Sequence, residues 1–218
     1  MTSKVNDLLT KAHRLVIKVG TSTLTHTTGK LNLFQLERLA AEITQLKKKN
    51  LEVILVSSGA IAAGMGRMGL PERPKTMPEK QALAAIGQGI LMQTYEQYFS
   101  EQGETVAQVL LTKDDIAHRE RYLNARNTLL ALLKMKAIPI INENDTVVVE
   151  EIKIGENDTL SALVAGLVDA DLLILLSDID GLYTADPRKD ATAQLIPVVG
   201  QITAEIEELA GEPGSKMA

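Results

Sequence analysis

One lysine near the start of the chain interrupts an apolar run and is followed by a glycine and several hydroxyl side chains. Lys18 lies between Ile17 and Val19 in the segment LVIKVGTSTLT, and Gly20 follows. The run is typical of a buried parallel strand, in which a lysine needs a partner because desolvating its charge is costly. At the carboxyl end of such a strand, Lys18 and Gly20 could form a phosphate-binding site. A snorkelling lysine before an ordinary turn fits this stretch equally well.

Polar clusters also follow other apolar runs of the sequence. The clusters at predicted strand ends are residues 18–21, 57–59, 142–145 and 177–181, and a fifth cluster, residues 155–158, precedes a predicted helix. One polar strand end is ordinary turn chemistry. Five such clusters predict a shared site, because the carboxyl ends of strands in a doubly wound sheet meet at one edge.

Short acceptor side chains in these clusters suit the binding of an ammonium group. Asn142, Asp145 and Asn157 carry amide or carboxylate oxygens of this kind. Ser58 directly precedes a predicted helix of small residues, whose first backbone N–H groups can bind an anion. A network of Asx turns and simple helix capping would use the same residue types.

Three aspartates could bind a cation or pair with a positively charged side chain. Asp158 could orient Lys18 or help to hold a metal ion, although an acidic residue in the first turn of a helix is common without such a role. Asp178 and Asp180 flank the exit of a buried strand and could contact a nucleotide or Mg²⁺. The glycine clusters spell neither GxxxxGK[ST] nor GxGxxG after a strand, so an ordinary P-loop and a dinucleotide fold are disfavoured.

The elements that must position these residues alternate between strands and helices. Apolar runs predict strands over residues 15–19, 52–57, 105–111, 137–141, 172–176 and 195–199. Helical spacing predicts helices that include residues 33–46, 60–64, 80–100, 129–133, 158–168 and 203–209, with a loop or lid over 69–79 and part of a hairpin over 147–154. This alternation predicts an α/β protein, a three-layer α-β-α sandwich with a mostly parallel central sheet.

Composition excludes several other classes of protein. The 218 residues carry a net charge of −5, which argues against a general surface for nucleic acid or for an anionic membrane. The absence of Cys excludes disulfides and thiolate metal sites, and no ligand spacing around His118 predicts direct metal ligation by the protein. The N-terminal residues lack a signal-peptide pattern, so we predict a cytoplasmic protein. Small residues over 82–89 favour close helix packing and a homo-oligomer.

Six longer segments, taken together, resemble the amino acid kinase family. They read IKVGTSTLT, VSSGAIAAG, LLTKDDIAHRERYLNARNTLLALL, PIINENDTV, IKIGENDTLSALVA and LLSDIDGLYTADPR, and they cover nearly the whole chain in the family's order. The resemblance is greatest to members that phosphorylate the γ-carboxylate of L-glutamate. It implies the family's fold, the use of ATP with Mg²⁺, formation of glutamyl 5-phosphate as the first step of proline biosynthesis, and feedback inhibition by proline.

The resemblance also implies roles for individual residues. Lys18 stands where the family contacts the ATP phosphates, and Asp158 stands where an aspartate organises that lysine, so we predict both as catalytic. The predicted ATP-binding residues are Lys18, its neighbour Gly20, Ser177 and Asp178. The predicted glutamate-binding residues are Ser58, Asp145 and Asn157 from the family pattern, and Asn142 from the cluster that it shares with Asp145.

The sequence departs from the family near its last residues. The family continues after the helix near Ala210 into a Thr-Gly-Gly-Met loop with a second catalytic lysine, then into more sheet and often a PUA domain. Here the sequence reads GEPGSKMA, and its Lys216 is not in that loop motif. We therefore predict one amino acid kinase domain over residues 1–218 that is incomplete at its C-terminus. A catalytically impaired fragment that binds glutamate or proline remains an alternative, as does a kinase for acetylglutamate, aspartate, carbamate or a phosphate monoester.

Overall fold

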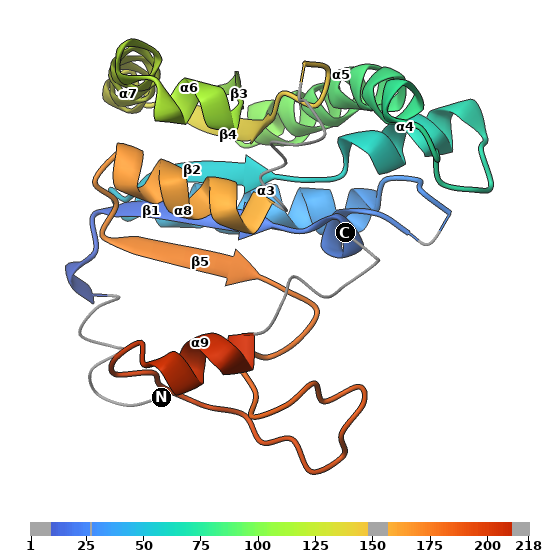
Figure 1. Cartoon of the computed structure of the whole chain (residues 1–218). Coiled ribbons are helices and arrows are strands. Elements are labelled where there is room, and N and C mark those ends of the chain that lie inside the picture. Colours follow the sequence, from blue (N-terminus) through green and yellow to red (C-terminus); the bar gives the residue numbers. More distant parts are fainter. Residues whose placement is uncertain (1–9, 27, 148–156, 211–218) are drawn as a thin grey trace. The chain divides into compact units, whose positions relative to one another are not determined.

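The structure is a computed structural model that describes residues 10–26, 28–147 and 157–210 (Figure 1). The chain divides into two compact units, with the boundary after Leu176. The predicted hairpin over 147–154, apart from Val147, lies outside the described residues.

The first unit contains a five-stranded sheet in which every pairing is parallel. Its strands are β1 (Arg14–Val19), β2 (Glu52–Ser57), β3 (Val106–Leu111), β4 (Ile138–Glu143) and β5 (Leu172–Leu176), in the order β3-β4-β2-β1-β5. The five strands predicted before residue 177 are thus confirmed. Strand β1 lies between β2 and β5, and Lys18 pairs in register with Val56 and Leu175. The sheet therefore carries Lys18 on an interior strand.

Several helices of this unit begin at a side chain that caps their first turn. The helices of the unit are α2 (Thr21–Leu24), α3 (Leu33–Lys48), α4 (Ala60–Met68), α5 (Met77–Glu101), α6 (Lys113–Ala117), α7 (Arg119–Lys134) and α8 (Asn157–Leu167). Asn32 accepts from the backbone N–H of Gln35, as its spacing predicts. Helix α5 starts at Met77, earlier than predicted, because Thr76 and Glu79 form a capping box there.

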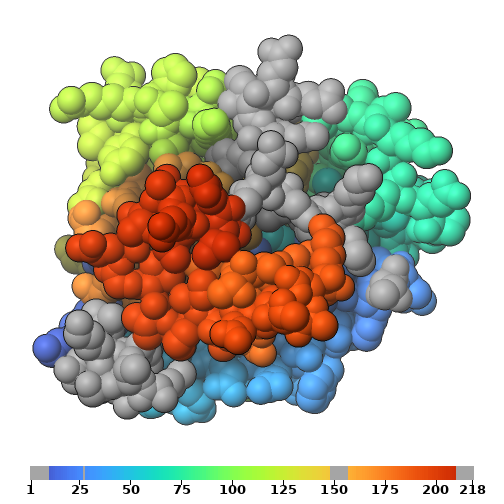
Figure 2. All heavy atoms as spheres, turned by 60° about the horizontal axis from the view of Figure 1, so that its bottom comes forward, coloured from blue at the N-terminus to red at the C-terminus, as the bar shows by residue number. Residues whose placement is uncertain are grey.

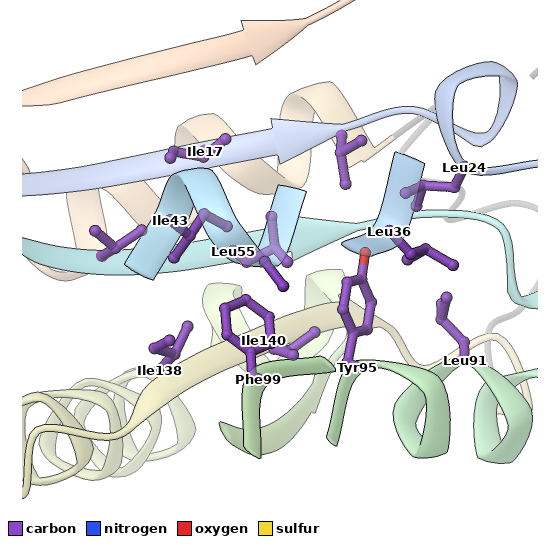
Figure 3. Close-up of a cluster of buried hydrophobic side chains, with 13 residues drawn as sticks. Ile17, Leu24, Leu36, Ile43, Leu55, Leu91, Tyr95, Phe99, Ile138 and Ile140 are labelled. Carbon is purple, nitrogen blue, oxygen red and sulfur yellow. The ribbon is translucent and has the colours of Figure 1, made fainter. Parts of the chain in front are cut away.

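Helices cover both faces of the sheet, which confirms the predicted three-layer arrangement. One core packs α3 and α5 against β1, β2 and β4, and Figure 3 shows its side chains, among them Ile17, Leu55 and Tyr95. The second core packs α7 and α8 against the other face, where it includes Val16 and Leu160. Successive residues of β1 thus point to opposite faces, as the period of a strand requires.

Two glycines allow α4 and α5 to pack unusually closely. A Cβ atom at Gly87 would lie 1.7 Å from the carbonyl oxygen of Ala60, and one at Gly64 would lie 2.1 Å from that of Leu83. At Gly89 a Cβ atom would meet nothing within 4 Å. Part of the small-residue pattern in α5 therefore serves packing within the chain, and the predicted homo-oligomer stays a prediction.

The second unit contains little regular structure among its described residues. Helix α9 (Ala204–Ala210) confirms the predicted final helix. The predicted strand over 195–199 is wrong, because Leu195 forms only an isolated antiparallel bridge with Tyr183. Most side chains of this unit are exposed, and that of Ile202 is 76% exposed. Figure 2 shows atoms of this unit, coloured orange to red.

Candidate active site

The alternation of β1 brings Lys18 to the face of the sheet that α8 covers. Val16, two residues earlier, packs in the core with α8, so the side chain of Lys18 leaves the strand on the same side. Its Nζ atom lies 2.8 Å from Oδ1 of Asp158, which stands in the first turn of α8. The Lys18 side chain is only 13% exposed. The carboxylate thus holds the ammonium group at the carboxyl end of an interior strand.

Two glycines shape the backbone beside this ion pair. Gly20 follows β1 and precedes α2, and a Cβ atom there would lie 3.5 Å from Nζ of Lys18. Gly59 precedes α4 with φ of 100°, a left-handed conformation that glycine adopts without steric cost. Between them, the backbone N–H of Ser58 donates to the carbonyl oxygen of Val19 over 3.2 Å. The first turn of α4 therefore begins directly beside the end of β1.

Asn157 ties the ends of three elements together. Its Nδ2 donates to the carbonyl oxygen of Ser57 over 2.9 Å, to Oγ of Ser58 over 2.7 Å and to Oδ1 of Asn142 over 2.9 Å. Two hydrogens serve three acceptors, so at least one of these bonds is shared. Asn157 directly precedes Asp158, and the network therefore lies next to the Lys18–Asp158 pair.

Asp145 lies in a small pocket beside this network. Among the described residues, no hydrogen bond or ion pair joins it to the other predicted site residues. The pocket also contains Gln88, whose Oε1 accepts from Nδ2 of Asn142 over 2.8 Å. The pocket is lined by Ala84, Gln88, Leu110, Glu143, Asn144, Asp145 and Thr146. Burial raises the pKa of Asp145 from its ordinary value of 3.8 to about 6. A cationic group in the pocket would offset this cost by favouring the ionised form.

The predicted site residues fall into two sets. The structure brings together Lys18, Gly20, Ser58, Asn142, Asn157 and Asp158, with Asp145 in the adjoining pocket. Ser177 and Asp178 belong to the second unit, where Nη2 of Arg188 donates to Oδ2 of Asp178 over 2.8 Å. Their nucleotide-binding role stays a prediction. Gly155 and Glu156 of the fifth cluster lie outside the described residues.

Sequence reasoning missed two polar residues behind the site, Gln88 and Tyr95, and it placed Ser57 in a strand-end cluster without a partner. Gln88 binds Asn142, and Oγ of Ser57 lies 2.8 Å from the hydroxyl oxygen of the fully buried Tyr95. The structure also extends β4 through Asn142 and Glu143, which were predicted to follow the strand. A glutamine between Gly87 and Gly89 in a mostly apolar helix was the one available signal for Gln88.

The part of the chain that the structure describes contains neither a cluster of metal ligands nor a helix that could span a membrane. Within residues 10–26, 28–147 and 157–210, no three acidic, histidine or cysteine side chains are grouped so that they could hold a metal ion. In the same ranges, no helix combines the length and the apolar character that crossing a membrane requires.

Comparison with known proteins identifies the family. Residues 13–216 match the model of the amino acid kinase family. The chain belongs to this family. A solved UMP kinase from Ureaplasma parvum has the same fold, with a TM-score of 0.58 over 85% of this chain and 75% of that one. The two sequences are only 15% identical, so this similarity concerns the amino acid kinase fold alone.

Close relatives within the amino acid kinase family are glutamate 5-kinases. That of Moorella thermoacetica is 62% identical over 207 residues, which are 95% of this chain and 55% of the relative. That of Clostridium acetobutylicum is 55% identical over 209 residues, which are 96% of this chain and 78% of the relative. The chain thus spans about half the length of several glutamate 5-kinases that it matches.

Proposed function

We propose that the whole protein transfers the γ-phosphoryl group of ATP to the γ-carboxylate of L-glutamate. The products are ADP and glutamyl 5-phosphate, and the reaction is the first step of proline biosynthesis in the cytoplasm. Most support comes from the network in which Asn157 joins Ser58 and Asn142 beside the Lys18–Asp158 pair. With the roles predicted for these residues, acceptors suited to an amino acid would lie next to a cation suited to phosphate. The names of the close relatives support the same reaction.

Asp145 and Asn157 supply the acceptors that an amino-acid ammonium group needs. The carboxylate of Asp145 lies in the pocket, and the amide oxygen of Asn157 receives no hydrogen bond from any residue that the structure describes. Ser58 and Asn142 hold Asn157 in place from either side. Proline carries the same ammonium and carboxylate groups, so we propose that it inhibits by competing for these acceptors.

The reaction brings one anion to a polyanion, and the chain provides positive potential at that point. A lysine about 4 Å from a phosphate oxygen contributes on the order of 4 kcal/mol at an effective dielectric constant of about 20. Lys18, the N–H of Gly20 and the first turn of α4 would face the phosphates. Mg²⁺ would bind through the phosphates, and Ser177 with Asp178 would contact the nucleotide. No general base is needed, because the γ-carboxylate is ionised at pH 7.

Trapping of the acyl phosphate with hydroxylamine tests this proposal. The full-length protein, given ATP, Mg²⁺ and L-glutamate, is expected to form γ-glutamyl hydroxamate. N-acetyl-L-glutamate, which lacks the ammonium group, and L-aspartate are expected to give little product. Equal or faster turnover of N-acetyl-L-glutamate would contradict the assigned substrate, and the absence of any hydroxamate would contradict the proposed reaction.

Substitution of Asp145 by asparagine is expected to weaken substrate binding and to stabilise the free protein. At pH 7 the ionised carboxylate destabilises the fold, because burial raises its pKa. We expect Asp145→Asn to raise the free energy of unfolding by about 1–2 kcal/mol, since the carboxylate is partly exposed. The Kd for L-glutamate should rise by about tenfold or more, because a charged acceptor is lost.

Calorimetry and denaturant unfolding at pH 7 measure these two effects. Asp114→Asn serves as the control, because Asp114 is exposed and lies outside the pocket. The folded state binds more protons at Asp145 than the unfolded chain between pH 3.8 and about 6, so stability from this group falls as pH rises through that window. The stabilisation by Asp145→Asn should therefore disappear near pH 4. Unchanged glutamate affinity would place the substrate elsewhere.

The affinity for L-glutamate is expected to depend on pH through Asp145. Only the ionised carboxylate pairs with an ammonium group, and its pKa in the free protein is about 6. Calorimetric affinity should therefore be about tenfold weaker at pH 5 than at pH 7. Glu143 also lines the pocket, so Asp145→Asn is needed to assign the dependence. A pH dependence of the same size in Asp145→Asn would exclude Asp145 as its source.

A further inference from the structure

Gln88 connects the pocket of Asp145 to the network around Asn157. It lies on α5, is half-buried and lines the pocket. Its Oε1 accepts from Nδ2 of Asn142 over 2.8 Å. Asn142 is only 3% exposed, so this amide has little access to water. Gln88 therefore satisfies a donor that would otherwise be buried without a partner.

The backbone fixes which end of the Asn142 amide faces Gln88. The N–H of Glu143 donates to Oδ1 of Asn142 over 2.9 Å, and a backbone N–H can only donate. The oxygen of Asn142 must therefore face Glu143, and its NH₂ group must face Gln88. For the same reason Gln88 must present its oxygen to Asn142.

The same reasoning fixes the amide of Asn157. The carbonyl oxygen of Ser57 can only accept, and Oδ1 of Asn142 already has its orientation set, so both require the NH₂ end of Asn157. The oxygen of Asn157 then faces away from these partners. An amide turned the other way would present donors to the ligand and would repel an ammonium group.

We infer that Gln88 is a positioning residue that sets the polarity of the substrate site together with the N–H of Glu143 and the carbonyl oxygen of Ser57. Through Asn142 it keeps the oxygen of Asn157 available as an acceptor, and so favours a ligand with an ammonium group. This inference rests on the proposed function in so far as the ligand is an amino acid. Without the acceptor of Gln88, the NH₂ group of Asn142 is buried and unpaired, and the N–H of Glu143 and the carbonyl oxygen of Ser57 alone fix the orientation of the two asparagine amides. The common orientation of the two amides is then less stable.

Gln88→Met tests the inference, because methionine has a similar length and lacks the amide oxygen. We expect the Kd of the full-length protein for L-glutamate to rise about tenfold. Gln93→Met is the matched control, since Gln93 is exposed on the same helix, and should leave Kd unchanged. On an Asn157→Ala background, Gln88→Met should add less than about twofold, because the route through Asn157 is already lost. A full tenfold effect on that background would overturn the inference.

A second measurement without ligand separates this inference from the proposed function. Hydrogen exchange of the side-chain NH₂ groups, followed by ¹⁵N–¹H spectra, should be faster at Asn142 and Asn157 in Gln88→Met. Gln88→Glu, which keeps an acceptor oxygen for Asn142, should retain slow exchange at Asn157. Unchanged exchange in Gln88→Met would overturn the inference. Changed exchange in a protein that does not bind L-glutamate would support the positioning role and reject the proposed substrate.

Discussion

Replacement of Lys18 by alanine is expected to lower kcat for glutamate phosphorylation by about 100- to 1,000-fold in the full-length protein. Oδ1 of Asp158, 2.8 Å from Nζ of Lys18, holds the Lys18 ammonium group at the end of β1. In the proposed reaction, this ammonium group would stabilise the negative charge on the transferred phosphoryl group. Its loss removes stabilisation of the transition state, whereas the acceptors around Asn157 remain. The KM for L-glutamate should therefore change by less than about threefold.

Steady-state kinetics with a matched lysine variant checks this expectation. Lys30→Ala is the control, because the side chain of Lys30 is exposed and forms no ion pair with any residue that the structure describes. It should keep wild-type kcat. An unchanged kcat in Lys18→Ala would remove Lys18 from the reaction, and a rise confined to KM would assign it to substrate binding alone.

Gly87→Ala is expected to destabilise the protein by about 3 kcal/mol, or to prevent folding. The added Cβ atom would lie 1.7 Å from the carbonyl oxygen of Ala60 and 2.4 Å from the backbone nitrogen of Gly64. Both contacts are with backbone, so no side-chain rotation relieves them, and α4 must move away from α5. Because α4 begins at the site beside Ser58 and Gly59, binding of L-glutamate should weaken as well.

Gly89→Ala is the matched control on the same helix. A Cβ atom at Gly89 meets nothing within 4 Å, and alanine is the better helix former. We therefore expect Gly89→Ala to stabilise the protein by about 0.5–1 kcal/mol. Denaturant unfolding of the two variants measures the difference. Equal stability of Gly87→Ala and the wild type would contradict the close packing of α4 on α5.

Local patterns were sufficient to predict most of the first unit. The apolar runs around Ile17, Leu55 and Ile174 are long enough to identify buried strands, and Asn32 caps its helix as its spacing indicates. The convergence of strand ends also followed from the alternation of strands and helices, since parallel strands present the same end at one edge. The ion pair of Lys18 with Asp158 is a consequence of that topology.

Long-range partners could not be read from the sequence. Gln88 and Asn142 are separated by 54 residues, and nothing in either local pattern indicates that their amides meet. Asn142 lies within β4 because β3 continues beside it, pairing Leu110 with Asn142, and a polar residue does not reveal that extension. The prediction of a strand over 195–199 was wrong because only Leu195 of this segment forms a β-bridge, an isolated one with Tyr183.

The most direct test is a crystal structure of the full-length protein with L-glutamate and a non-hydrolysable ATP analogue. The ammonium group of glutamate is expected within hydrogen-bond distance of Asp145 and of Oδ1 of Asn157. The γ-carboxylate should face the terminal phosphate of the analogue, with Nζ of Lys18 on that phosphate. Glutamate bound away from Asp145 and Asn157, or phosphates bound away from Lys18, would contradict the account.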